Sequence, residues 1–260
     1  MSVPEAIILG IIQGLTEFLP VSSSGHLTLF QYIMGHGGET PLMFDICLHV
    51  SSLFAVIIFF RKKLLSLSKG VFDKKTKKDS FREVFMICIS TFVTASMVFF
   101  TKPLLMNIRK EPGLLFFTFL FTAVILLAAG YMMKKKNEDR AINVKDAIFI
   151  GFFQGLAVLP GISRSGSTIA AGLFRKISRE KAVEYSFLLF IPAILGALVL
   201  ELAGEEWRTM EILPVIAGST TSFVSSLLAL KLLIIMVKKT LMFPFSIYLG
   251  ILSLTVLIFI

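Results

Sequence analysis

Charged residues are scarce in this sequence. Lys, Arg, Asp and Glu make up 17% of the 260 residues, whereas 55% are hydrophobic and 26 are phenylalanine. The mean hydropathy is +0.84. A soluble domain of this length needs more charge to cover its surface. The composition therefore excludes a soluble globular protein and indicates an integral membrane protein.

Cysteine and histidine are also rare, with two and three residues respectively. Cys47 and Cys88 fall in different apolar segments, form no CxxC motif and have no histidine at metal-ligand spacing. We therefore expect both to pack in the interior rather than to bind a metal. The first residues carry no basic region of the kind that opens a signal peptide, so we expect them to belong to the fold.

Six apolar segments are long enough to cross a hydrocarbon core of about 30 Å. They lie at residues 41–60, 83–101, 113–133, 184–203, 212–231 and 240–260. These segments predict an all-α polytopic membrane protein with residues 1–260 in a single integral membrane domain.

Two further regions are too interrupted to span a membrane alone, and they resemble each other. The first, "AIILGIIQGLTEFLPVSSSGH", begins at Ala6, and the second, "AIFIGFFQGLAVLPGISRSGS", begins at Ala147. Each has an apolar run, a Leu-Pro break and a serine-rich turn before a second short apolar run, which is typical of a re-entrant helical hairpin. We predict such hairpins at residues 3–34 and 146–175, with both turns enclosed by protein.

The order of these segments predicts an inverted-topology repeat. Three spans separate the two hairpins, so the second hairpin must enter the membrane from the opposite face. Each half, residues 1–133 and 134–260, then has one re-entrant hairpin and three transmembrane helices.

The distribution of basic residues agrees with this topology. The loops at 61–82, 134–145, 175–181 and 238–239 hold twenty Lys and Arg, whereas the other side holds four: Lys102, Arg109, Lys110 and Arg208. Basic loops stay in the cytoplasm. Both termini and the first hairpin are therefore expected on the outer side.

Arg164 lies in the turn of the second hairpin, where an arginine near the bilayer centre costs ~2.5 to 3.5 kcal/mol on insertion scales. One interpretation is that Arg164 only pairs with an internal carboxylate, for which Glu17 is the candidate. The other is a phosphate site, since guanidinium groups and the free N–H groups of a helix start both bind phosphate oxygens. Four neighbouring hydroxyls would contribute to it: Ser163, Ser165, Ser167 and Thr168.

The turn of the first hairpin carries groups suited to nucleophilic chemistry. Gln13 and Glu17 are four residues apart and so share one face of a helix that leads to the serine-rich turn. Ser23 and His26 are close enough in sequence for a hydrogen bond, and a histidine beside Glu17 can activate a serine hydroxyl. The alternative is that these serines only cap a helix and satisfy the backbone.

The two motifs together resemble those of a known family. "QGLTEFLPVSSSGH" is similar to the (E/Q)xxxE motif and Ser/His turn of the undecaprenyl-diphosphate phosphatases, the bacitracin-resistance family, and "PGISRSGST" is similar to their PGxSRSxxT motif. The resemblance extends over essentially the whole chain. It implies an enzyme of the bacterial inner membrane that hydrolyses undecaprenyl diphosphate to the monophosphate and so renews the lipid carrier of cell-wall synthesis.

The resemblance also implies roles for particular residues. Ser23, His26 and Glu17 are expected to be catalytic. The substrate phosphates are expected to contact Arg164, Ser163, Ser165, Thr168, Ser22, Ser24 and Gln13. Attack by Ser23 would give a phosphoseryl intermediate, but His26 as the nucleophile, or as the base for direct attack by water, stays open.

The expected partners are a polyprenyl diphosphate lipid and membrane lipids, not nucleic acid, and the sequence leaves both a monomer and a homodimer open. The family is described as needing a divalent cation. Mg²⁺ or Ca²⁺ is expected to arrive largely on the diphosphate, because Glu17 is the one carboxylate placed deeply enough to be its ligand.

Two other functions fit the sequence less well. A type-2 phosphatidic acid phosphatase needs a histidine after its Ser-Arg motif, and no histidine follows His49. A polyprenyl-phosphate flippase could use the same inverted-repeat site but would have no use for a Ser23–His26 pair. His36 and His49 receive no role, and Asp45 is expected to face the cavity or to pair with Lys102.

Overall fold

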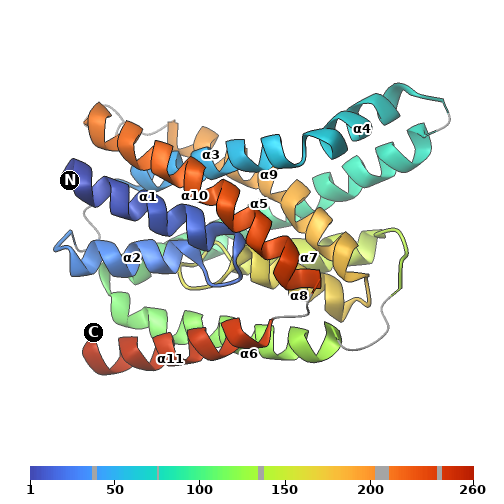
Figure 1. Ribbon diagram of the computed structural model, residues 1–260. Helices are drawn as coiled ribbons and strands as arrows, with labels where there is room; N and C mark the ends of the chain where they lie inside the picture. The colour runs from blue at the N-terminus through green and yellow to red at the C-terminus, as the bar shows by residue number, and fades with distance from the viewer. Residues whose placement is uncertain (37–39, 75, 134–137, 203–210, 239–241) are drawn as a thin grey trace.

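The computed structural model is built from helices (Figure 1). It describes all residues except 37–39, 75, 134–137, 203–210 and 239–241. Within the described residues there is no β-strand, only an isolated bridge between Glu138 and Ile177. Helices satisfy their own backbone hydrogen bonds, which a chain surrounded by hydrocarbon requires.

The helices have the following bounds: α1 (Val3–Phe18), α2 (Ser23–Ile33), α3 (Leu42–Phe59), α4 (Arg61–Phe72), α5 (Lys77–Lys110), the 3-10 turn η1 (Pro112–Leu114), α6 (Leu115–Met133), α7 (Val144–Leu156), α8 (Arg164–Phe174), α9 (Arg179–Leu202), α10 (Ile212–Lys238) and α11 (Phe243–Phe259).

Five of the six predicted spans are confirmed as helices long and apolar enough to cross a membrane. They are α3, α5, α6 with η1, α9 and α10. The sixth, predicted at residues 240–260, corresponds to α11, an apolar helix of 17 residues, which lies at the short end of the lengths that cross a bilayer. The chain is therefore a multi-pass membrane protein.

Helix α5 is longer than the sequence predicted. It has 34 residues and continues through Lys102 and Pro103 to Lys110, where we expected a loop from residue 102. Arg109, near the end of the helix, is buried and paired with Asp45, with Nη1 of Arg109 2.5 Å from Oδ2 of Asp45. The predicted loop at 61–82 likewise contains a helix, α4.

The short helices form two pairs, α1 with α2 and α7 with α8, each joined by a turn. In each turn a serine caps the following helix. Ser22 Oγ accepts a hydrogen bond from the backbone N–H of Gly25 at 3.4 Å, and Ser163 Oγ accepts one from Gly166 at 3.1 Å. These caps satisfy N–H groups that have no partner within the helix.

The two turns touch each other inside the protein. A Cβ added to Gly25 would lie 2.7 Å from the backbone N of Gly161, so only glycine allows this approach. Gly161 also has φ +90°, which favours glycine. Thr122 of α6 completes the enclosure, since its hydroxyl donates to the Gly161 carbonyl at 2.8 Å and accepts from the Ser163 N–H at 3.2 Å.

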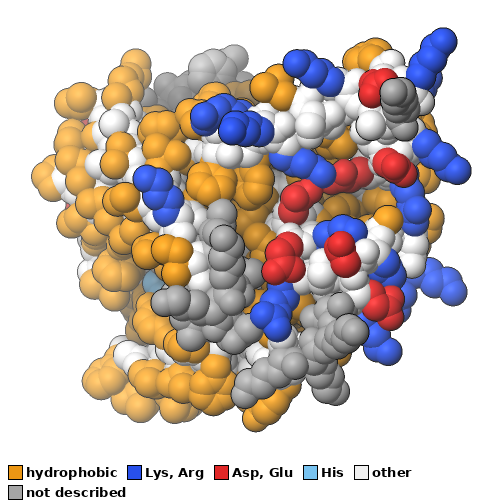
Figure 2. All heavy atoms as spheres, turned by 45° about the vertical axis from the view of Figure 1, so that its right-hand side comes forward, with side chains coloured by type: hydrophobic (Ala, Val, Ile, Leu, Met, Phe, Trp, Pro, Cys, Tyr) orange, Lys and Arg blue, Asp and Glu red, His pale blue; other side chains and the backbone are white. Residues whose placement is uncertain are grey.

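The two chain termini lie at the same end of the molecule (Figure 1). Charged side chains gather toward one side of the view in Figure 2, and the opposite side is largely hydrophobic. Lys63 of α4 pairs there with Glu83 of α5 at 3.1 Å and with Glu184 of α9 at 2.6 Å. The charged end and the apolar body agree with a protein that spans a membrane and has one strongly charged face.

Helix α1 packs closely on α10 because two glycines of α1, Gly10 and Gly14, face α10. A Cβ on Gly14 would lie 2.0 Å from Ser225 Oγ and 2.4 Å from the Ser222 carbonyl oxygen, whereas a Cβ on Gly250 of α11 would meet nothing within 4 Å. Rotating the Ser225 side chain would not relieve the contact at Gly14, because the Ser222 carbonyl oxygen and the Ser226 nitrogen at 2.8 Å belong to the backbone.

We expect Gly14→Ala to lower the thermal stability of the protein in detergent, with an overpacking cost of about 1–3 kcal/mol. The matched control, Gly250→Ala, should be neutral or slightly stabilising, because alanine favours a helix by about 1 kcal/mol over glycine. Thermal unfolding of the purified variants measures both. Equal melting temperatures for the two variants would show that α1 and α10 are not held at this distance.

Candidate functional site

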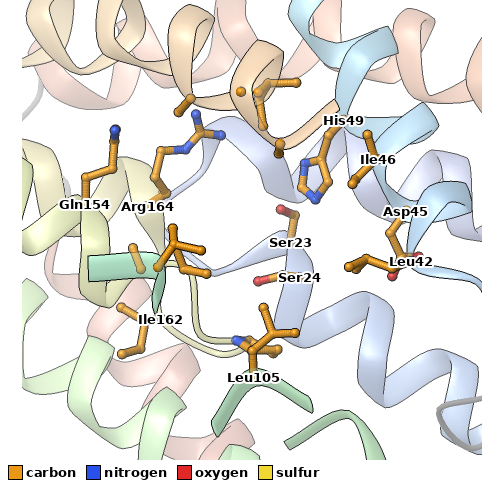
Figure 3. A pocket seen from close by; sticks show the side chains of 18 of the residues that line it. Ser23, Ser24, Leu42, Asp45, Ile46, His49, Leu105, Gln154, Ile162 and Arg164 are labelled. Carbon is orange, nitrogen blue, oxygen red and sulfur yellow. The ribbon is translucent and has the colours of Figure 1, made fainter. Parts of the chain in front are cut away.

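A cavity of about 350 Å³ lies among α2, α3, α5, α9 and the turn before α8 (Figure 3). Six residues predicted for the site line it: Glu17, Ser22, Ser23, Ser24, Ser163 and Arg164. Apolar side chains of α5 and α9, among them Val98, Leu105 and Leu200, form much of the remaining wall. The cavity therefore combines the polar groups of the two turns with a mainly apolar wall, which also carries four charged residues: Asp45, Lys102, Arg109 and Glu201.

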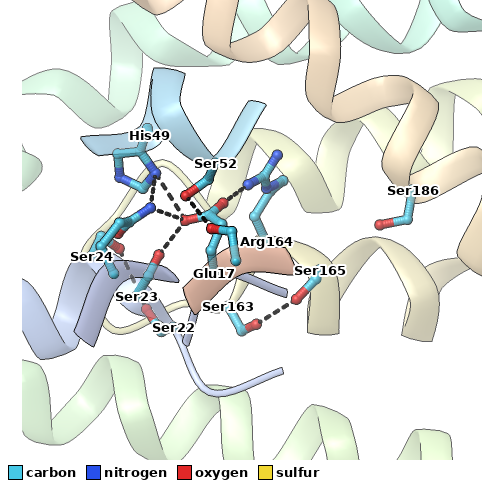
Figure 4. Close-up of polar contacts among 12 residues, drawn as sticks. Glu17, Ser22, Ser23, Ser24, His49, Ser52, Ser163, Arg164, Ser165 and Ser186 are labelled. Carbon is cyan, nitrogen blue, oxygen red and sulfur yellow. Dashed lines mark hydrogen bonds and ion pairs between the residues drawn. The ribbon is translucent and has the colours of Figure 1, made fainter. Parts of the chain in front are cut away.

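Glu17, at the end of α1, connects the residues at the polar end (Figure 4). Its Oε2 accepts hydrogen bonds from Gln13 Nε2 and Ser23 Oγ, each at 2.6 Å. Its Oε1 accepts one from Nη2 of Arg164. The side chains of Gln13 and Glu17 are thus on one face of α1, as their spacing predicted, and both turns are joined through one carboxylate.

Arg164 is the first residue of α8, and its side chain is 16% exposed. Its Cζ lies 3.7 Å from the centre of the Phe190 ring, a cation–π contact. The ion pair with Glu17, which was one of the two interpretations of Arg164 in the sequence, is present. Nη1 is buried without a hydrogen-bond partner among the described residues, so the pair leaves part of the binding capacity of the guanidinium unused.

The hydrogen bond expected between Ser23 and His26 is not formed, so that prediction is wrong. Nδ1 of His26 lies 2.8 Å from the carbonyl oxygen of Ser22, and Nε2 lies 2.7 Å from the hydroxyl of Tyr248 on α11. The imidazole also stacks on the Tyr248 ring and is not among the residues that line the cavity. Although the two residues lie one turn apart in α2, each is engaged elsewhere: Ser23 by Glu17, and His26 by the Ser22 carbonyl and the Tyr248 hydroxyl.

His49, for which we predicted no role, lies beside the Glu17 carboxylate. Its Nδ1 lies 2.8 Å from Oε2 of Glu17 and 2.7 Å from Nε2 of Gln13, and the side chain lines the cavity. The signal in the sequence was its position four residues after Asp45 in an apolar helix, which puts the two polar residues on one face. His36 instead lies 3.3 Å from the carboxylate of Glu5.

Asp45 lines the cavity, but it does not pair with Lys102. Its carboxylate binds Arg109 at 2.5 Å and accepts a hydrogen bond from Gln31 Nε2 at 2.6 Å. Nη2 of Arg109 also donates to the Thr40 carbonyl at 2.8 Å. The extension of α5 brings Arg109 to Asp45, whereas the sequence predicted Arg109 in a loop.

The remaining predicted residues support the turns rather than lining the cavity. Ser165 Oγ donates to the Leu19 carbonyl at 3.3 Å, which links the second hairpin to the first. Thr168 donates to the Arg164 carbonyl at 2.8 Å and lies 2.6 Å from Ser186 of α9. Ser167 Oγ is buried without a partner in the part of the chain that the structure describes.

The side chains at the site do not form a metal centre. Among the described residues, no group of three or more His, Cys, Asp or Glu is arranged to hold a metal ion. Both oxygens of Glu17 are already engaged by Gln13, Ser23, His49 and Arg164. This donor set does not fit a divalent cation held by the protein, since Mg²⁺ and Ca²⁺ require several oxygen ligands.

The geometry suits transfer of a phosphoryl group to a serine. The Ser23 hydroxyl donates to Oε2 of Glu17, a carboxylate that can accept its proton. The other oxygen of Glu17 accepts a hydrogen bond from Arg164. An arginine binds phosphate oxygens and stabilises the charge that develops on them.

Comparison with known proteins gives a consistent result. A sequence model described as "Bacitracin resistance protein BacA" matches residues 6–255. The undecaprenyl-diphosphatase of Alkaliphilus metalliredigens is 38% identical, with 95% of each chain covered. The enzymes of the same name from Desulfatibacillum aliphaticivorans and Bacteroides thetaiotaomicron are each 39% identical, covering 98% and 99% of this chain and 97% and 99% of their own. The chain therefore belongs to the BacA family of bacitracin resistance proteins.

Proposed function

We propose that this protein hydrolyses undecaprenyl diphosphate to undecaprenyl phosphate and inorganic phosphate, recycling the lipid carrier of cell-wall synthesis. Relatives of that name match it over nearly their whole length. The observation that carries the proposal is the Ser23 hydroxyl donating to the Glu17 carboxylate, which is itself paired with Arg164 in a cavity with apolar walls. A lipid diphosphate needs these same features: a reactive group, a phosphate ligand and an apolar path.

The first chemical step is assigned to Ser23. The terminal phosphate binds Arg164, the hydroxyls of Ser22, Ser24 and Ser163, and the N–H groups at the start of α8. By drawing the guanidinium toward itself, the phosphate weakens the Arg164–Glu17 pair and makes Glu17 a better base. Ser23 Oγ then bonds to the terminal phosphorus, the bond to the leaving lipid phosphate breaks, and the serine proton passes to Glu17.

The second step regenerates the serine. Water bonds to phosphorus, the bond to Ser23 Oγ breaks, and Glu17 returns the proton to that oxygen. Because His26 is held by Ser22 and Tyr248, we assign it to fixing the turn that carries Ser23. A direct role of His26 as a base or nucleophile would require it to leave one of these partners.

The divalent cation implied by the family resemblance is assigned to the substrate. A diphosphate offers several anionic oxygens, and Mg²⁺ usually binds through substrate phosphates together with retained waters. Glu17 alone is too occupied to replace them.

The membrane arrangement is inferred to be an inverted repeat of residues 1–133 and 134–260 in the bacterial inner membrane. The pairs α1–α2 and α7–α8 approach the centre of the molecule from opposite ends in Figure 1, and the termini share one end, which supports it. The basic loops would face the cytoplasm and the termini the outside. Boundary residue 134 lies outside the described residues, as do several basic residues counted for orientation: 75, 134–136, 208 and 239.

The proposed activity is tested by phosphate release from undecaprenyl diphosphate by the purified protein in detergent. We expect Ser23→Ala to lower the rate on the order of 10²- to 10⁴-fold, because it removes the group that attacks phosphorus. Ser96→Ala is the matched control, since Ser96 is not among the residues that line the cavity and its hydroxyl donates to the Phe92 carbonyl of its own helix. Lipid binding without phosphate release by the wild type would instead favour a flippase.

Loss of Arg164 alone would remove the guanidinium from the buried Glu17 carboxylate, which keeps His49 Nδ1 at 2.8 Å, at a cost of up to about 3–5 kcal/mol. The double variant Glu17→Gln, Arg164→Met avoids this cost. We expect it to fold more stably than Arg164→Met alone while releasing phosphate on the order of 10³-fold more slowly than wild type. Melting temperature and activity are measured on the same samples, and an active double variant would remove the pair from the mechanism.

The orientation is tested by cysteine labelling in intact cells, in a background with Cys47→Ala and Cys88→Ala. Glu211→Cys and Lys69→Cys each place a thiol at an exposed residue. A membrane-impermeant reagent should label Glu211→Cys from outside and Lys69→Cys only after permeabilisation. The reverse pattern would contradict the inferred orientation.

A further inference from the structure

Gln154 of α7 is a buried polar residue that the mechanism above does not use. It is 2% exposed and lines the same cavity as Ser23 and Arg164. In the internal repeat it occupies the position that Gln13 holds in the first hairpin. Gln13 is directed at Glu17, whereas no carboxylate occupies the corresponding place beside Gln154, where the matching residue is Val158.

The hydrogen bonds around Gln154 fix the orientation of its amide. Nε2 donates to Thr94 Oγ1 at 3.2 Å. The Thr94 hydroxyl has one proton, which it donates within 2.9 Å of the Ser90 carbonyl and 3.0 Å of the Gly151 carbonyl. Toward Gln154, Thr94 can therefore only accept, so the NH₂ group must face it. The carbonyl oxygen Oε1 is left buried with no partner among the described residues.

Arg164 provides the complementary unused group. Its Nη1 is a buried donor without a partner in the described part of the chain, and Arg164 lines the same cavity. In Figure 3, Gln154 and Arg164 lie on one side of the pocket, with Ser23 and His49 across from them. Buried polar groups left without partners are costly, so a ligand that satisfies both is strongly favoured.

The ligand must accept from a guanidinium and donate to an amide oxygen. A fully ionised phosphate oxygen meets the first requirement but is repelled by the carbonyl oxygen, because neither carries a proton. A water molecule meets both requirements. It can donate one hydrogen to Gln154 Oε1 and accept a hydrogen bond from Arg164 Nη1, which leaves one lone pair free to attack phosphorus.

We propose that Gln154 binds and orients the water that hydrolyses the phosphoseryl intermediate, an inference that rests on the function proposed above. In-line displacement requires water to approach phosphorus from the side opposite Ser23 Oγ, which is the side of Gln154. The water oxygen bonds to phosphorus as the bond to Ser23 breaks. Both water protons stay on the released phosphate, and Glu17 returns the proton that it took in the first step to Ser23 Oγ.

The test compares two substitutions in the full-length protein in detergent. Gln154→Met has a similar size but cannot accept a hydrogen bond, whereas Gln154→Glu keeps an acceptor. With undecaprenyl diphosphate, Gln154→Met should give an initial burst of lipid phosphate and then slow phosphate release, reduced on the order of 10²-fold, the effect of misplacing a reactant. Mass spectrometry should find phosphate on the Ser23 peptide of Gln154→Met but not of Gln154→Glu.

The control variant is again Ser96→Ala, because Ser96 is not among the residues that line the cavity and its hydroxyl donates to the Phe92 carbonyl at 2.9 Å. It should match wild type in both measurements. Equal loss of the burst and of steady-state turnover in Gln154→Met would assign Gln154 to substrate binding and overturn the inference, as would unchanged turnover or a phosphorylated Gln154→Glu. If wild type itself released no phosphate, the proposed function would fall, and the inference with it.

Discussion

The ion pair between Glu17 and Arg164 is the interaction on which the site depends. It joins the end of α1 to the start of α8, residues 147 apart in sequence. Within a protein interior neither charge is tolerated alone, so each fixes the other and the two turns that carry them. The pair also concentrates a base and a phosphate ligand at one point. A structural requirement of the fold and a chemical requirement of the reaction are thus met by the same two side chains.

The meeting of the two turns is a second constraint, and it explains why small and hydroxylated residues are concentrated there. Irregular backbone within a membrane protein must find hydrogen bonds inside the protein. Ser22, Ser163 and Thr122 supply them, while Gly25 and Gly161 allow the backbones to approach. The serines that look reactive in the sequence therefore divide into two kinds. Ser22 and Ser163 cap helices, and Ser23 is the one bonded to the carboxylate.

Much of this arrangement follows from local sequence, and the rest does not. Length and apolarity were enough to predict five spanning helices, and the four-residue spacing of Gln13 and Glu17 was enough to predict their shared face. The partners of His26 could not be predicted, because Tyr248 is 222 residues away. The Asp45–Arg109 pair was not predicted for the same reason, since the two residues are 64 apart in sequence and Arg109 lies in the extended end of α5. The inverted repeat and the catalytic roles of the site residues stay predictions.

The size of the cavity has a consequence for how the protein meets its substrate. About 350 Å³ is enough for a small polar head group but not for a polyprenyl chain as well. The polyprenyl chain must then stay among the lipids while the head group is in the cavity. The two parts of the substrate would be connected along the apolar side chains of α5 and α9. The protein and its substrate therefore meet by lateral diffusion in the plane of the bilayer. The quantity that governs turnover is the mole fraction of substrate among the surrounding lipids, not its concentration in water.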